Sequence, residues 1–175
     1  MKGLFKYIVL ILAFALLAVL LQSSVLRMIL PVWAVPNFIL ISVVFLAFRL
    51  PTARGALIAF ALGLLLDVSS AQLLGPNAGA FVAVFGLLAA LSQRLFVQAP
   101  VTLACTIFGA SVLSSLIFML MTYEYKSIGG HVLLGLFGQA IVTAIVSPLV
   151  IAGLNRLVKP DRDIGATSSH RRGRR

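Results

Sequence analysis

Asp67 is the residue that most constrains what this chain can fold into. It is the first acidic residue of the sequence and lies in an apolar stretch, Gly63-Leu-Leu-Leu-Asp67, with no other Asp or Glu before Tyr123. The chain is 61% hydrophobic and only 10% charged, which is more apolar than a water-soluble domain of 175 residues can bury in one core. Lipid is therefore the expected solvent. A carboxylate in a membrane span is costly unless it faces protein or water, which makes Asp67 a candidate functional residue.

Uncharged stretches of membrane-spanning length recur along the sequence. A helix needs about 20 apolar residues to cross the hydrocarbon layer. Four uncharged runs each hold one such helix: 7–26, 28–48, 95–123 and 132–155. A longer run, 55–93, has Asp67 as its sole charge and holds two helices. The sequence thus predicts an all-α polytopic membrane protein, a six-transmembrane-helix bundle with short loops.

The predicted bundle forms one domain, residues 1–158. The composition changes after it, because residues 159–175 are polar, basic and rich in small side chains. Such a segment has too little apolar surface to form a core, so we expect a disordered cytoplasmic tail.

The basic residues predict the orientation of this bundle. Of the 14 Lys and Arg residues, all but Arg27 and Lys126 fall on one side of a six-helix arrangement. Because positive residues accumulate on the cytoplasmic side, both termini are expected there, N-in and C-in. Nucleic-acid binding is not expected, since no aromatic platform accompanies the basic residues. The positions expected to anchor the topology and to meet anionic lipids are Arg49, Arg54, Arg94, Arg171, Arg172, Arg174 and Arg175.

Small residues four apart predict which helix faces meet. In lipid, helices associate where small side chains let their backbones approach, and residues four apart share one side of a helix. The third predicted helix carries Gly55, Ala59 and Gly63 at this spacing, with Asp67 next in the row. We therefore expect Asp67 to face a neighbouring helix rather than lipid. The fourth helix repeats the device with the pairs Gly79/Ala83 and Gly86/Ala90, which predicts a close antiparallel hairpin.

Polar residues collect at the predicted outer helix ends. Gln22, Asn37 and Asn77 reach a depth similar to that of Asp67, and Arg27 and Glu124 can join them. Three interpretations of Asp67 stay open. It caps a helix end or hydrogen-bonds the 69–77 turn, it forms part of a partner or ligand site, or it couples protons or ions. The sequence contains no metal-ligand spacing, nucleophile elbow or phosphate loop, so we expect no enzyme and no cofactor.

Four short motifs follow one another along the chain: Pro36-Asn37, Leu50-Pro51, Gly63-Leu-Leu-Leu-Asp67 and Leu74-Gly75. Together they resemble the rod shape-determining protein MreD family. Length, six-helix plan and basic tail are similar as well. This chain departs from the family pattern at Ala71, where glycine is common, and at Asn77, where a basic residue is common. The motif residues, which are candidates for interaction or structure, are Pro36, Asn37, Pro51, Gly63, Asp67, Leu74 and Gly75.

The resemblance implies a non-enzymatic inner-membrane scaffold of the bacterial cell-elongation complex. Implied partners are an MreC-like bitopic protein and, indirectly, the filament MreB, the synthase RodA and a penicillin-binding transpeptidase. MreD-like bundles also resemble the substrate-binding subunits of energy-coupling-factor vitamin transporters. A vitamin-binding membrane subunit is therefore the alternative, although the predicted outer helix halves hold few aromatic residues for ligand stacking.

Overall fold

The computed structural model describes residues 2–20, 22, 28, 34–70, 74–92, 100–122 and 130–157. These residues form six α-helices and no strand, which confirms the all-α class. The helices are α1 (Lys2–Leu20), α3 (Phe38–Arg49), α4 (Ala53–Ser69), α5 (Pro76–Ser92), α6 (Pro100–Thr122) and α7 (Gly130–Leu157). The predicted tail, residues 159–175, lies outside the described part of the chain, as do Arg94 and the four C-terminal arginines.

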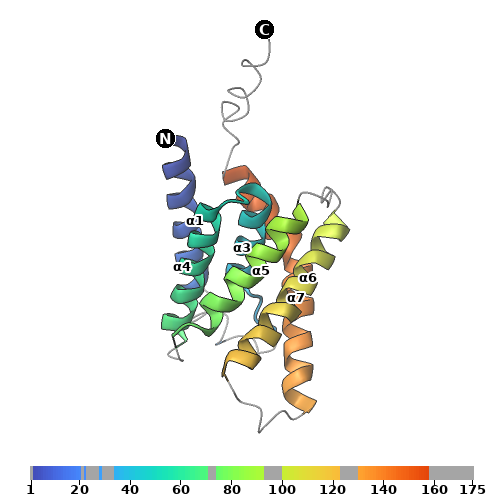
Figure 1. Ribbon diagram of the computed structural model, residues 1–175. Coiled ribbons are helices and arrows are strands. Elements are labelled where there is room, and N and C mark those ends of the chain that lie inside the picture. The colour runs from blue at the N-terminus through green and yellow to red at the C-terminus, as the bar shows by residue number, and fades with distance from the viewer. Residues whose placement is uncertain are drawn as a thin grey trace, which may run out of the picture.

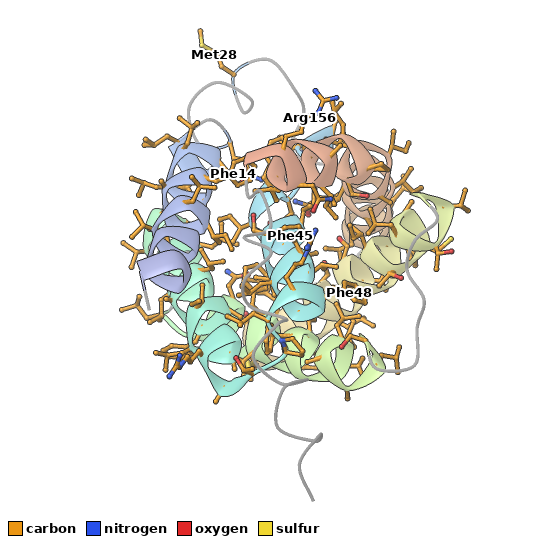
Figure 2. All side chains as sticks on the ribbon, turned by 90° about the horizontal axis from the view of Figure 1, so that it is seen from above. Phe14, Met28, Phe45, Phe48 and Arg156 are labelled. Carbon is orange, nitrogen blue, oxygen red and sulfur yellow. The ribbon has the colours of Figure 1, made fainter. Side chains whose placement is uncertain are left out.

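Five helices surround a central one. Helix α3 packs against α1, α4, α5, α6 and α7, and Figure 2 shows it in the middle of the ring with the label of Phe45 beside it. Helices that follow one another along the chain run in opposite directions, so the start of α1 and the end of α7 lie at the same end of the bundle (Figure 1). We call this the terminal end, and the opposite end, where α4 finishes and α5 begins, the Asp67 end.

Helix α3 is covered by protein along most of its length, since its nine consecutive residues 39–47 are all buried. Its sequence permits this because a helix that is hydrophobic all round can be buried against protein as well as against lipid. The helix has only 12 residues, or about 18 Å at 1.5 Å per residue, against a hydrocarbon layer of about 30 Å. It is therefore shorter than that layer and shorter than each of the five helices around it.

The outward faces of the other helices are apolar. Soluble monomers rarely expose such a continuous apolar surface, so lipid is its natural solvent. Each of the five outer helices contributes to this surface, for example through Leu16 and Leu17 of α1, Leu57 of α4, Leu87 of α5, Val101 and Leu120 of α6, and Leu134, Ile145 and Leu149 of α7.

Two helices meet the length and composition expected of a membrane span, Val101–Thr122 and Leu134–Arg156. The helical segments Val9–Leu20, Phe38–Arg49 and Pro76–Ser92 are apolar but shorter. The sequence analysis expected six full spans. The described structure has six helices, of which α6 and α7 are long enough by themselves.

Helices α4 and α5 form the close hairpin that the small residues predicted. Gly55, Ala59, Gly63 and Asp67 are all buried. A Cβ atom on Gly63 would lie 2.4 Å from the Cα atom of Ala78, so the two backbones touch where glycine leaves room.

The prediction for the facing row on α5 was wrong in part. Ala83, Gly86 and Ala90 are exposed, and a Cβ on Gly86 would meet nothing within 4 Å. Gly79 approaches Met121 of α6 instead. The reason is that α5 also covers α3 and uses its larger residues for that contact, with Phe81, Val84, Phe85 and Leu88 buried.

Candidate functional site

Asp67 is fully buried and hydrogen-bonded on both oxygens. Its exposed fraction is 0%, which confirms that it faces protein. Oδ2 accepts hydrogen bonds from the backbone N–H groups of Gly75 (2.9 Å) and Ala78 (3.2 Å). Oδ1 accepts one from the backbone N–H of Asn77 (3.2 Å) and one from its Nδ2 (2.8 Å). All four partners are donors, an arrangement that suits an ionised carboxylate, which can only accept.

The four bonds make Asp67 the N-terminal cap of the next helix. A capping side chain normally belongs to the N-cap residue and accepts from the N–H groups two and three positions later. The N-cap position of α5 is Gly75, which has no side chain. The carboxylate of Asp67, at the end of α4, accepts the hydrogen bonds that an N-cap side chain would accept. The first helical position is Pro76, which has no N–H to satisfy. Since Gly79 N donates to Gly75 O at 2.8 Å, every backbone N–H of the first turn has a partner.

Gly75 is required by the turn that brings this cap into place. Its φ is +119°, a conformation that side-chain-bearing residues rarely adopt. The turn lets the chain reverse within a few residues after α4. The neighbouring motif residue Leu74 is 69% exposed, so its side chain packs against none of the core.

These contacts match the first of the three interpretations of Asp67, a helix cap that also bonds the turn. The side-chain partner is an amide, that of Asn77, rather than a cation. Arg27 and Glu124, the charged residues that the sequence placed near this depth, lie outside the described part of the chain.

A second polar contact set holds the start of α3. Asn37 is its N-cap, and its Oδ1 accepts from Leu40 N at 3.0 Å. The backbone N–H of Asn37 donates to Thr143 Oγ1 of α7 at 3.1 Å, and Gln139 Nε2 donates to the carbonyl of Val35 at 3.3 Å. Non-helical backbone at membrane depth is tolerated where protein satisfies its polar groups. Helix α7 does so here for the carbonyl of Val35 and the N–H of Asn37.

A cavity of about 430 Å³ lies at the Asp67 end of the bundle. The described residues that line it come from the end of α1, the start of α3, the end of α4, the start of α5, the end of α6 and the start of α7. More than half of them carry uncharged polar side chains, among them Gln22, Asn37, Asn77, Ser114, Ser115 and Gln139. The sequence analysis expected Gln22, Asn37 and Asn77 to gather at this depth, and the structure confirms it.

One cavity residue has an unsatisfied polar atom. Gln22 Nε2 donates to the carbonyl of Pro36. Gln22 Oε1 is buried without a hydrogen-bond partner, the one such side-chain atom among the described residues. An unmade hydrogen bond of this kind costs about 1–3 kcal/mol, so a ligand or water that supplies a donor would be stabilised there.

The terminal end of the bundle is basic. Arg49, Arg54 and Arg156 lie there and are exposed. Arg49 donates to Asn155 Oδ1 of α7 at 2.6 Å and lies 5.7 Å from the centre of the Phe45 ring, so its charge sits at the bundle edge while its stem packs inward. Pro51, in the turn after α3, is exposed beside it.

The comparison with known families decides what kind of protein this is. Residues 2–157 match the profile of the rod shape-determining protein MreD family. The chain belongs to the MreD family. The match ends at Leu157, the last residue of α7, so it covers the whole described bundle. MreD proteins are membrane proteins with a role in rod shape, which agrees with the apolar outer surface of this bundle. No curated protein and no solved structure matches the chain significantly.

The sequence analysis missed three features of this site. It did not foresee that Gln139 and Thr143 hold the start of α3. It also overlooked Gly75-Pro76 as the start signal of α5, although a proline in the first helical position is a recognisable one. It did not foresee that Ser114 and Ser115 line a cavity, and no local signal points to that.

Proposed function

We propose that this MreD protein is a non-enzymatic scaffold of the cell-elongation complex in the bacterial inner membrane. In this role it holds an MreC-like bitopic protein and, through it, MreB and the peptidoglycan synthase formed by RodA and a penicillin-binding transpeptidase. The observation that supports this most is the family match over residues 2–157. The use of Asp67 agrees with it, because the carboxylate is committed to four hydrogen bonds inside the fold.

In this proposal the protein crosses the membrane six times with both termini in the cytoplasm. Two observations favour it. The helical part starts and ends at the same end of the bundle (Figure 1), and Arg49, Arg54 and Arg156 are at that end. Positive residues are retained on the cytoplasmic side, where they also meet anionic lipids. The Asp67 end then faces the outer leaflet.

Scaffold contacts in this proposal use the outer helix faces. Apolar side chains that are strongly exposed, such as Leu57 (73%) and Leu149 (77%), offer surface to a transmembrane helix of another protein. Between helices in lipid, packing rather than water exclusion drives association. Small exposed residues are useful for that, and Ala83, Gly86 and Ala90 form such a row on α5.

Depletion tests the proposal. Cells in which this chain is placed under repressible control should lose rod shape and become round, and a plasmid copy should restore rods. A photo-reactive residue at position 57 or 149 should capture a single-span protein, whereas one at the buried Leu62 should not. Cells that stay rod-shaped after complete depletion would show that the proposal is wrong.

The second candidate function is a vitamin-binding membrane subunit, and the cavity is the observation that favours it. Vitamin sites combine convergent polar groups with aromatic stacking. Among the described lining residues Phe118 is the sole aromatic and none is charged. The scaffold is therefore the function we propose first.

A further inference from the structure

We propose that the cavity at the Asp67 end binds a small neutral molecule rich in hydroxyl and amide groups. This goes beyond the scaffold role and does not depend on it. The cavity measures about 430 Å³, within the range of about 300–1,000 Å³ that is usual for small-molecule sites.

The lining argues against an apolar occupant. An acyl chain would remove water from serine, asparagine and glutamine side chains without replacing its hydrogen bonds, and that is unfavourable. The wall is also apolar in part: Val19, Val35 and Leu66 line it, and so do Phe118 and Leu136. Phe118 and Leu136 provide the apolar contact that one face of a sugar ring or the methyl of an acetamide can use.

Charge argues against an ionic occupant. None of the described residues that line the cavity is charged, and an ion held by these residues alone would lose water without gaining a counter-charge. Asp67 is close in the fold but does not line the cavity, and both of its oxygens are already engaged. A cation would have to break the α5 cap to reach it.

The free hydrogen-bonding groups fit a molecule with both donors and acceptors. Within the described part of the chain, Ser70, Ser114 and Ser115 form no side-chain hydrogen bond, although all three line the cavity. Their hydroxyls can donate or accept. Gln139 uses its Nε2 on Val35 and keeps Oε1, and Gln22 has its unsatisfied Oε1. Hydroxyl and amide groups on one ligand would complement this mixture.

Asn77 would connect such a ligand to the fold. It lines the cavity, and its Nδ2 bonds Asp67. A ligand that bonds the free Oδ1 of this amide fixes the orientation of the whole group. Binding should therefore also stabilise the α4–α5 cap, and the thermal midpoint of the protein should rise when the site is filled.

The test is a binding measurement on the purified full-length protein in lipid nanodiscs. The neutral probes are N-acetylglucosamine and sorbitol. The charged comparator is glucosamine, which is cationic, and the apolar comparator is octanoate, which carries an acyl chain. Saturation-transfer NMR and the thermal midpoint are the readouts. We expect saturable binding of at least one neutral probe, a raised midpoint, and no saturable binding of either comparator.

Variants on α6 locate the site. Ser115→Ala removes one hydroxyl and should weaken binding about fivefold, the equivalent of one ordinary hydrogen bond. Ser115→Phe should fill the space and abolish binding. Leu120→Phe adds the same ring at a position that is 61% exposed on the outside of α6, and should leave binding unchanged.

Three results would overturn the proposal. The first is no saturable binding of either neutral probe, which would mean a cavity filled by water only. The second is tighter binding of glucosamine or octanoate, which would assign the wrong chemical class. The third is binding that Ser115→Ala leaves unchanged, which would put the probe elsewhere. If Ser115→Phe does not fold, Ser115→Ala still decides. Cell shape after depletion is unaffected by these outcomes, so the scaffold proposal stands or falls separately.

Discussion

The side-chain amide of Asn77, on α5, donates a 2.8 Å hydrogen bond from Nδ2 to Oδ1 of Asp67, on α4. The other three donors to this carboxylate are backbone N–H groups of residues 75, 77 and 78. The two side chains therefore have different importance. The side chain of Asp67 accepts all four hydrogen bonds at the start of α5, whereas the side chain of Asn77 donates one of the four.

Asp67→Asn should destabilise the bundle although it preserves shape. The new amide has one oxygen and one NH₂, so its nitrogen faces backbone N–H donors that then lack an acceptor. A buried donor without a partner costs about 1–3 kcal/mol, and the favourable charge at the helix N-terminus is lost too. Unfolding of the purified protein in mixed micelles measures the change. Normal expression together with full complementation of rod shape would mean that the charge is irrelevant.

Substitutions of Asn77 should separate charge from shape. Asn77→Ala removes one hydrogen bond and should cost about 1 kcal/mol. Asn77→Lys puts a cation beside Asp67, matching the basic residue common in related proteins at this position, and should be at least as stable as Asn77→Ala. Asn77→Asp puts two carboxylates together and should be the least stable of the three. The same micelle unfolding assay ranks them, and a different order would mean that Asp67 carries no charge.

The backbone contact at Gly63 predicts a sharp difference between two glycines. Gly63→Ala forces a Cβ to within 2.4 Å of the Cα of Ala78, so α4 and α5 must separate, at a cost of about 1–3 kcal/mol. Gly86→Ala is the matched control, because nothing lies within 4 Å of its added Cβ. That change should be neutral or stabilise by up to about 1 kcal/mol, the difference in helix propensity. Equal effects at the two positions would contradict the close hairpin.

The contact between Thr143 and Asn37 predicts a similar contrast. Thr143→Val leaves the backbone N–H of Asn37 without its acceptor and should cost about 1–3 kcal/mol. Thr106→Val is the control, since Thr106 bonds only the carbonyl of Thr102 in its own helix, and Thr143 makes an equivalent bond to Gln139. The difference between the two variants isolates the interhelical contact. Hydrogen exchange at the start of α3 should rise in the first variant and not in the second.

Sequence alone predicted the six helices of the described residues and the burial of Asp67, because both follow from local patterns. Charge-free length predicts a helix, and the spacing of Gly55, Ala59 and Gly63 places Asp67 on the packed face. The central position of α3 could not be predicted in the same way. Its all-apolar sequence resembles that of a lipid-facing span, and only the surrounding helices show that residues 39–47 are covered by protein.

The exact partners of polar residues were equally out of reach of the sequence. Asp67 reaches residues 75, 77 and 78 because the turn at Gly75 folds α5 back along α4, and that path depends on three-dimensional geometry. The wrong part of the packing prediction has the same origin. Small residues on α5 mark a contact face, but α5 has three competing neighbours, α3, α4 and α6, and its larger side chains decide which side turns inward.

The proposed orientation can be tested with single cysteines at the two ends of the bundle. In a Cys105→Ala background, which removes the native exposed thiol, Thr52→Cys places a thiol in the exposed turn before α4 at the terminal end, and Leu74→Cys places one in the exposed turn at the Asp67 end. A membrane-impermeant maleimide applied to spheroplasts should label position 74 directly and position 52 only after permeabilisation. Since α4 alone separates the two positions, both thiols reacting before permeabilisation would mean that this helix does not cross the membrane. Labelling of position 52 alone would reverse the orientation, and the basic terminal end would then face outward.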